Sequence, residues 1–139
     1  MQAVGDGSLW IGNTTDLRKP AALYEAGVAA VVDLAYEAAP TVLPRDLIYA
    51  RFPLIDGEGN ERHLLQAAIQ TVAMLLRLKI PMLVACGAGM SRSPAVAAVA
   101  TACVFGGSPE VRLAELATEI AHDVSPAFWH ELREAMRGL

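Results

Sequence analysis

The chain has 139 residues, of which 54% are hydrophobic and 19% charged, and its formal net charge at pH 7 is -4. This length fits a single domain, residues 1–139, which buries roughly two thirds of its unfolded surface without help from metals or disulfides. The acidic balance, with only two lysines, disfavours nucleic acid and anionic membrane surfaces as partners.

The sequence has no segment typical of a secretory leader or a membrane span. No amino-terminal stretch combines a basic start with a long apolar run, and the apolar segment 94–105 is too short to cross a bilayer. A predicted helix separates Cys86 from Cys103, so no disulfide is expected, and Cys103 is interpreted as a small core residue. We therefore expect a cytoplasmic protein.

Strand and helix signals alternate along the first half of the chain. Residues 5–12 are typical of a short hairpin, and a helix is expected from Pro20 to Gly27. The runs 28–34 and 47–52 are rich in apolar residues and predict two strands. The segment 35–46 between them carries two prolines and little periodicity, which indicates a surface connection.

The second half continues the alternation. Residues 56–60 predict a loop, with Asn60 as the N-cap of an amphipathic helix that runs to about residue 79, followed by a strand over 82–85. Ser-Pro pairs at 93–94, 108–109 and 125–126 each predict an N-cap with a first-turn proline. The pattern predicts an α/β fold: a mostly parallel central sheet of four to five strands flanked by helices on both faces, with ligands bound at the carboxyl edge of the strands.

The most informative segment starts at Cys86, which ends a predicted strand, and leads through a glycine-rich turn to Arg92. Taken alone, Cys-x5-Arg is a weak signal, because it arises by chance in roughly one sequence of eight with this composition. The context strengthens it, because glycines let the backbone approach a ligand and the turn opens a helix. We expect the turn to bind phosphate through its backbone N–H groups and the arginine fork. The predicted phosphate-binding residues are Gly87, Ala88, Gly89, Met90, Ser91 and Arg92.

This arrangement suits nucleophilic attack on phosphorus. Only the thiolate attacks, and the inward N–H groups, the helix dipole and Arg92 would favour that form of Cys86. The leaving oxygen also needs a proton, and Asp56, flanked by glycines in a loop able to close, is the best candidate for the general acid. Asp33, at the end of a predicted strand, is the second candidate and is better explained as a hydrogen-bonded structural carboxylate.

Nearly the whole chain resembles a small dual-specificity phosphatase of the cysteine-dependent protein tyrosine phosphatase superfamily. Residues 9–13 resemble the family's opening strand, 52–56 its acid-bearing loop, 86–93 its signature loop and 125–132 its closing helix. The resemblance implies that Cys86 forms a phosphocysteine, that Arg92 clamps phosphate, and that Asp56 donates a proton and later activates water. Ser93 matches the terminal hydroxyl that helps the thiolate leave, although capping of the helix before Pro94 also explains it.

The sequence departs from the family pattern at two places. Ala85 precedes the cysteine where the family usually has His, and Ser125 opens the closing helix where an Asn is common. Neither departure removes a reacting group. Two functions stay open: a phosphatase acting on phosphotyrosine and/or phosphoserine and phosphothreonine of proteins, or on a non-protein phosphate ester, and a phospho-binding module with negligible turnover because of Ala85.

A rhodanese-like sulfurtransferase is a third possibility, and the Asp56 loop and the long helical tail argue against it. The three histidines, His63, His122 and His130, lack metal-like spacing. We therefore expect neither a metal nor a cofactor, and the sequence does not indicate the oligomeric state.

Overall fold

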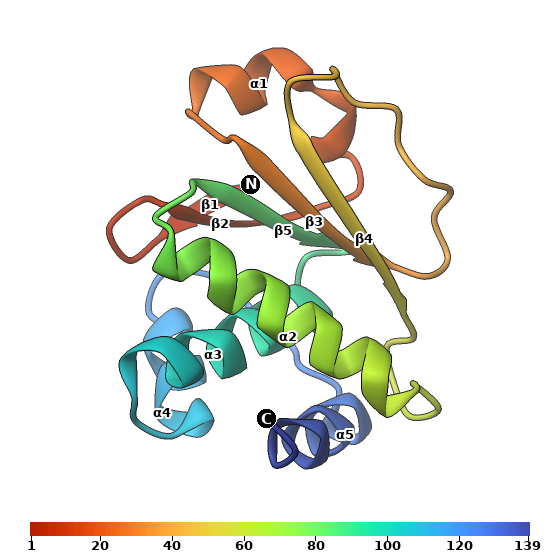
Figure 1. Ribbon diagram of the computed structural model, residues 1–139, viewed down its shortest axis with the longest axis vertical. Helices are drawn as coiled ribbons and strands as arrows, with labels where there is room; N and C mark the ends of the chain where they lie inside the picture. Colours follow the sequence, from red (N-terminus) through yellow and green to blue (C-terminus); the bar gives the residue numbers. More distant parts are fainter.

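Five strands form one sheet in the order β1-β2-β5-β3-β4 (Figure 1). β1 (Gln2–Val4) pairs antiparallel with β2 (Leu9–Asn13), so the predicted hairpin is present. β2, β5 (Met82–Cys86), β3 (Ala30–Ala35) and β4 (Ile48–Leu54) are parallel. The computed structural model, which describes residues 1–139, confirms the mostly parallel sheet expected from the sequence.

Helices cover both faces of the sheet, but unequally. A short 3-10 helix, η1 (Asp16–Arg18), and α1 (Pro20–Glu25) lie on one face. The other face carries α2 (Arg62–Arg77), α3 (Arg92–Phe105), α4 (Pro109–Leu116) and α5 (Pro126–Met136) (Figure 1). None of the helices has the length and apolar character needed to cross a membrane.

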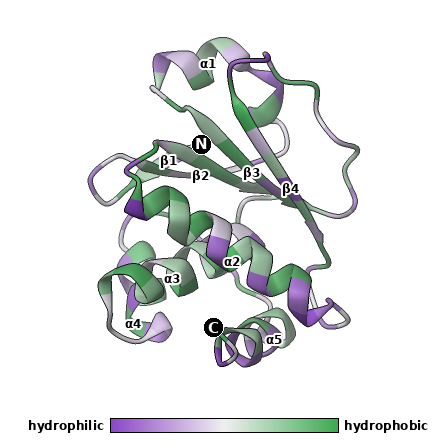
Figure 2. Cartoon of the chain, viewed as in Figure 1, coloured by the Kyte–Doolittle hydropathy of each residue, from purple (hydrophilic) through white to green (hydrophobic).

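The hydrophobic core is divided by the sheet into two clusters of different size. The larger contains 26 buried residues and includes most of α3, which is apolar on all sides and therefore central. The smaller lies between the sheet and the elements η1 and α1, and contains six buried residues: Leu17, Leu23, Val28, Val31, Leu83 and Ala85. Figure 2 shows the central strands β3 and β5 mainly in green, as expected for strands covered on both faces.

The helix starts correct two of the predicted N-caps. α3 begins at Arg92 with Ser91 as its N-cap, so Ser93 lies inside the first turn and does not cap the helix. Pro94 is tolerated there because first-turn N–H groups have no intrahelical partner. α2 begins at Arg62 after Glu61, because the Asn60 side chain bonds to its own loop instead.

The other two Ser-Pro predictions are confirmed. Ser108 accepts a hydrogen bond from Val111 N at 3.1 Å, and Ser125 accepts one from Phe128 N at 3.4 Å. Each proline occupies the start of its helix, α4 or α5, where its fixed φ suits the first turn.

Candidate active site

Cys86 is the last residue of β5, the central strand of the five-stranded sheet, and only 2% of its surface is exposed. The chain then turns through residues 87–91 into α3 at the carboxyl edge of the sheet, where the sequence predicted the site. The backbone N–H groups of residues 87–91 donate no hydrogen bond to any backbone carbonyl of the protein. A turn with free N–H groups beside a thiol and a helix start is an anion-binding environment.

Gly89 lets this turn rest directly on β2. Its φ is +75°, and a Cβ added there would lie 2.7 Å from the carbonyl oxygen of Gly12. Both the left-handed backbone and the lack of space therefore require glycine. The turn is held against the strand that pairs with β5, in which Asn13 lies opposite Cys86.

Arg92 is buried at the start of α3, with 5% of its surface exposed. Its Nη1 donates to Leu54 O at 2.7 Å and to Glu37 Oε2 at 2.8 Å, and its Nη2 donates to Glu37 Oε1 at 2.5 Å. Its Nε is buried and has no partner. The edge of the guanidinium formed by Nε and Nη2 therefore keeps donors free, in the fork geometry that binds two oxygens of a phosphate.

The two charges of this pair stabilise each other. Hydrogen bonds from Arg92 lower the pKa of Glu37 below its usual value. Burial alone would lower the pKa of Arg92, but the hydrogen bonds to Glu37 and the charges of Cys86, Glu37 and Asp56 outweigh it and raise that pKa. Arg92 is therefore a permanent cation despite its burial.

The structure brings Asp56 to this turn from the loop after β4. Ser91 Oγ donates to Asp56 Oδ1 at 2.6 Å, although the two residues are 35 positions apart in the chain. Ser91 Oγ in turn accepts a hydrogen bond from Ser125 N at 2.9 Å. One serine thus connects the loop that carries Asp56, the turn 87–91 and the start of α5, and Ser125 reaches the turn through its backbone.

The acid loop, residues 55–60, is fixed by two side chains whose roles the sequence analysis did not predict. Asn60 Oδ1 accepts from Ile55 N at 2.7 Å, and its Nδ2 donates to Ile55 O at 3.0 Å and Gly57 O at 3.2 Å. Glu131 on α5 accepts from Gly59 N at 2.5 Å and from Asn60 N at 3.0 Å. Gly57 and Gly59 correctly predicted a loop, but no feature of the sequence near them indicated the contact with α5.

Glu37 is the second group that the sequence analysis missed. It lies in the connection after β3, and its carboxylate remains about half exposed while it holds Arg92. An added Cβ on Gly87 would lie closer to Glu37 Oε1 than any real Cβ contact, so the carboxylate lies directly over the start of the turn. An irregular, exposed segment gives no periodic signal from which such a contact could have been found.

Asp33 is a structural carboxylate, as the sequence analysis favoured. It is fully buried, and it accepts hydrogen bonds from Tyr49 Oη at 2.6 Å and from Ala35 N at 3.2 Å. Burial and the bond to Asp33 raise the pKa of Tyr49, so this phenol stays a donor. Asp33 is therefore unavailable as a proton donor to a ligand.

Two further positions bear on the chemistry of the turn. The Ser93 hydroxyl is buried and has no hydrogen-bond partner. Leaving a buried hydroxyl unpaired costs free energy of folding, so its presence calls for an explanation. Ala85 is fully buried and belongs to the smaller apolar cluster, on the side of the sheet opposite α3. No imidazole stands behind the turn at that position.

Solved structures share this fold, although no family model and no curated protein matches the sequence. Human DUSP28 is 21% identical with a TM-score of 0.82, and the alignment covers 99% of this chain and 96% of that one. The human tyrosine phosphatase-like serine/threonine/tyrosine-interacting protein is 20% identical with a TM-score of 0.80, covering 96% and 93%. A mouse putative dual-specificity phosphatase complexed with zinc tungstate is 21% identical with a TM-score of 0.78, covering 95% and 84%. The chain therefore has the fold of the small dual-specificity phosphatases.

Proposed function

We propose that the chain is a cysteine-dependent phosphatase that hydrolyses phosphomonoesters of protein side chains, phosphotyrosine and/or phosphoserine and phosphothreonine. The observation that carries this proposal is the turn 87–91, whose backbone N–H groups are free of carbonyl partners between the Cys86 thiol and the Arg92 guanidinium. Free donors in a short turn beside the thiol suit stabilisation of the charge that develops on a phosphoryl group in the transition state. The fold shared with dual-specificity phosphatases supports the same reading.

In the first step, the Cys86 thiolate attacks phosphorus and the bond between phosphorus and the leaving oxygen breaks. The turn and the free edge of Arg92 hold the three non-bridging oxygens. Asp56 gives its proton to the leaving oxygen, and the product is the alcohol or phenol together with a phosphocysteine. The bond from Ser91 to one carboxyl oxygen, Asp56 Oδ1, supports this role because it fixes the carboxyl beside the turn.

In the second step, water attacks the phosphocysteine and Asp56, now a carboxylate, accepts the proton of that water. The sulfur-phosphorus bond breaks, inorganic phosphate leaves, and the thiolate of Cys86 is restored. The unpartnered Ser93 hydroxyl is available to donate to the departing sulfur. No metal or cofactor enters either step.

Hydrolysis of a small aryl phosphate in the presence of a chelator tests the proposal. Cys86→Ser is expected to abolish turnover, whereas Cys103→Ser, which changes the other free cysteine, leaves it intact. Asp56→Asn is expected to lower kcat by about 100-fold for alkyl or phenol leaving groups and much less for nitrophenol. Turnover that survives Cys86→Ser refutes the covalent mechanism, and an equal effect of Asp56→Asn on all leaving groups refutes the acid role.

A phospho-binding module with negligible turnover is the second candidate. Ala85 favours it, because the buried position before the cysteine offers only a methyl group to the apolar cluster and no hydrogen bond to the turn. One structural neighbour is itself described as a tyrosine phosphatase-like interacting protein. Measurable affinity for a phosphopeptide, with no phosphocysteine trapped by acid quench, would favour this candidate over the enzyme.

A further inference from the structure

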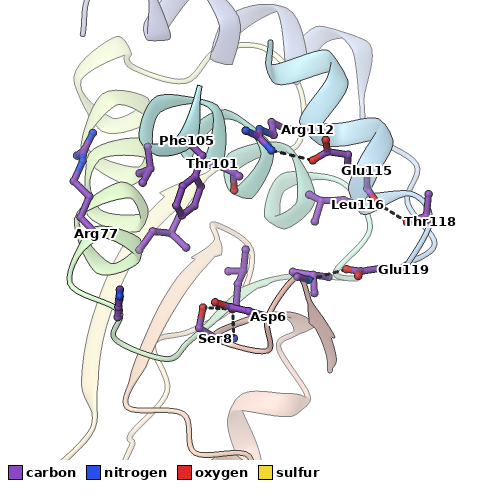
Figure 3. Close-up of a pocket in the computed structure, with 16 residues that line it drawn as sticks. Asp6, Ser8, Arg77, Thr101, Phe105, Arg112, Glu115, Leu116, Thr118 and Glu119 are labelled. Carbon is purple, nitrogen blue, oxygen red and sulfur yellow. Dashed lines mark hydrogen bonds and ion pairs between the residues drawn. The ribbon is translucent and has the colours of Figure 1, made fainter. Parts of the chain in front are cut away.

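A cavity lies at the amino ends of the parallel strands, at the opposite edge of the sheet from the turn 87–91. Figure 3 shows the side chains that line this cavity. Its volume is about 850 Å³, and it is bounded by the β1–β2 turn, the carboxyl ends of α2 and α3, and α4. α3 separates it from Arg92 by the helix length, about 20 Å for 14 residues. Small-molecule sites have volumes of about 300–1,000 Å³, so the cavity is large enough for one.

The interior of this cavity is apolar. Phe105, at the end of α3, is 64% exposed, and Figure 3 shows it between the α2 side and the α4 side of the cavity. The other apolar lining residues come from five different elements, β1, β2, α2, α3 and α4: Val4, Leu9, Leu76, Val104 and Leu116. A ligand that removes an exposed aromatic ring and a concave apolar surface from water gains binding free energy, so this lining suits a hydrocarbon chain.

The three acidic groups at the rim are held in place by donors of the protein, and only Glu115 is in an ion pair. Asp6 Oδ1 accepts from Ser8 N at 2.9 Å and from Ser8 Oγ at 2.7 Å, and Glu119 accepts from Gly5 N at 2.9 Å. Glu115 forms an ion pair with Arg112 at 3.2 Å. Arg112 also donates to Gly106 O, so this cation is occupied as well.

Two lining cations, Arg77 and Lys79, take part in no ion pair. Figure 3 shows the Arg77 side chain at the outer side of α2, away from Phe105. Lys79 is therefore the lining cation that remains at the α2 end of the cavity, and it lies near enough to Asp6 for its charge to help lower the pKa of that carboxyl.

The backbone at Lys79 supports a functional reason for this residue. It is the only non-glycine residue of the chain with a positive φ, 57°, and it directly follows Leu78, the C-cap of α2, where glycine is the usual choice. Lys79 N donates to Leu76 O and Ile80 N donates to Leu75 O, so the helix end would be formed equally well with glycine. Strained residues of this kind concentrate at functional sites.

From the unpaired charge, the strain and the apolar lining together, we propose that this cavity binds a single-chain amphiphile with an anionic head, of the fatty-acid class. The hydrocarbon chain lies against Leu76, Val104 and Phe105, and the carboxylate lies beside Lys79. The site is separate from the proposed catalytic turn and does not depend on its activity.

Calorimetric titration of the full chain with sodium dodecanoate, kept below its micelle concentration, tests this proposal. One saturable site is expected, together with no detectable binding of dodecyltrimethylammonium, which has the same chain and a cationic head. Lys79→Asn is expected to weaken dodecanoate about tenfold without unfolding the protein, because asparagine tolerates a positive φ. Lys19→Asn, the matched change at the other lysine, leaves binding unchanged, since Asn also suits its N-cap position.

Further variants separate the contributions of the chain and the head. Phe105→Ser removes an exposed ring and is expected to weaken dodecanoate, while Asp6→Asn removes a nearby negative charge and strengthens it. Cys86→Ser retains full binding, which distinguishes this site from the proposed catalytic site. Equal affinity of the two lysine variants, equal binding of both detergents, or no saturable site at all would overturn the proposal.

Discussion

The N–H groups of Arg92 fall into two sets: some bind other residues of the protein, and the others have no partner and are available to a ligand. Nη1 and one hydrogen of Nη2 bind the Glu37 carboxylate, Nη1 also binds Leu54 O, and Nε stays free. Because these contacts fix the plane of the guanidinium from one side, a phosphate approaching the other side meets a fork that is already oriented. We therefore expect Glu37 to be a positioning residue that orients Arg92 for the ligand.

Glu37→Gln is expected to lower kcat/KM for an aryl phosphate about tenfold. A charge-assisted pair contributes about 1.5–3 kcal/mol when buried, and the half-exposed carboxylate places this one at the low end. Glu58→Gln, in the acid loop, is the matched control and should leave kcat/KM unchanged. Steady-state kinetics that respond equally to both substitutions would contradict the positioning role.

The same pair sets a pH dependence of stability. Hydrogen bonds from Arg92 lower the pKa of Glu37 in the folded state. The pair therefore contributes its full stabilisation above the pKa of Glu37 in the unfolded chain, about 4.3. This contribution is lost as the pH falls through the lower, folded value. Urea unfolding should therefore show a difference between wild type and Glu37→Gln that is constant from neutral pH to about pH 5 and disappears in stronger acid.

Gly89→Ala is expected to abolish activity, because the turn must leave β2 to make room for the methyl group. Gly27 provides a matched control: its φ is +78°, close to the +75° of Gly89, but an added Cβ there meets nothing within 4 Å. Gly27→Ala should cost about 1–2 kcal/mol from backbone strain alone and keep full activity. The excess destabilisation of Gly89→Ala in urea unfolding measures the contact with Gly12, and equal values for both variants would show that strain alone explains the glycine.

At the scale of elements, the acid loop is held from two sides. Asn60 binds the loop internally at Ile55 and Gly57, and Glu131 binds Gly59 and Asn60 from α5. Ser91 adds a third connection at Asp56. The loop that the sequence analysis expected to be able to close is therefore already fixed beside the turn 87–91.

Glu131→Gln is expected to lower kcat about three- to tenfold for substrates with poor leaving groups, because Asp56 is less well positioned when the loop loses its anchor on α5. Nitrophenyl phosphate, which needs little protonation, should be hydrolysed almost normally. Glu134→Gln, on the same helix but paired only with exposed Arg137, is the control. A loss that is the same for both leaving groups would show that Glu131 supports the fold and not the acid.

Local pattern predicted the elements well and the contacts between them poorly. The β-branched run at β3 and the Ser-Pro starts of α4 and α5 follow from the backbone preferences of those residues, and the structure has them. The Ser93 cap was wrong because α3 already begins at Arg92, and the Asn60 cap was wrong because its side chain bonds to Ile55 and Gly57 in its own loop. The partners of Arg92 and of the acid loop, Glu37 and Glu131, are 55 to 72 positions away, and no local signal reports such distances.

At the scale of the whole molecule, the two faces of the sheet contribute different things. The larger cluster, beneath α2, α3 and α5, holds α3, the helix that begins directly after the turn 87–91. The smaller cluster lies directly behind that turn, and Ala85 is its link to Cys86. With only six buried members, this cluster has little capacity to absorb a change in volume, because cores are packed as densely as crystals.

The position of Ala85 in this cluster predicts that histidine, the residue usual at this position in dual-specificity phosphatases, does not fit here without cost. Ala85→His would insert an imidazole among Leu17, Leu23 and Val31, beside Asp33, whose carboxylate is already bound by Tyr49. Overpacking of a core costs about 1–3 kcal/mol, so the free energy of unfolding should fall by about that amount. Ala85→Ser, which adds one atom, should cost clearly less, and urea unfolding of both variants measures the difference. If Ala85→His were as stable as wild type and hydrolysed aryl phosphates faster, the smaller cluster would have room for the imidazole, and the second face of the sheet would not constrain the turn.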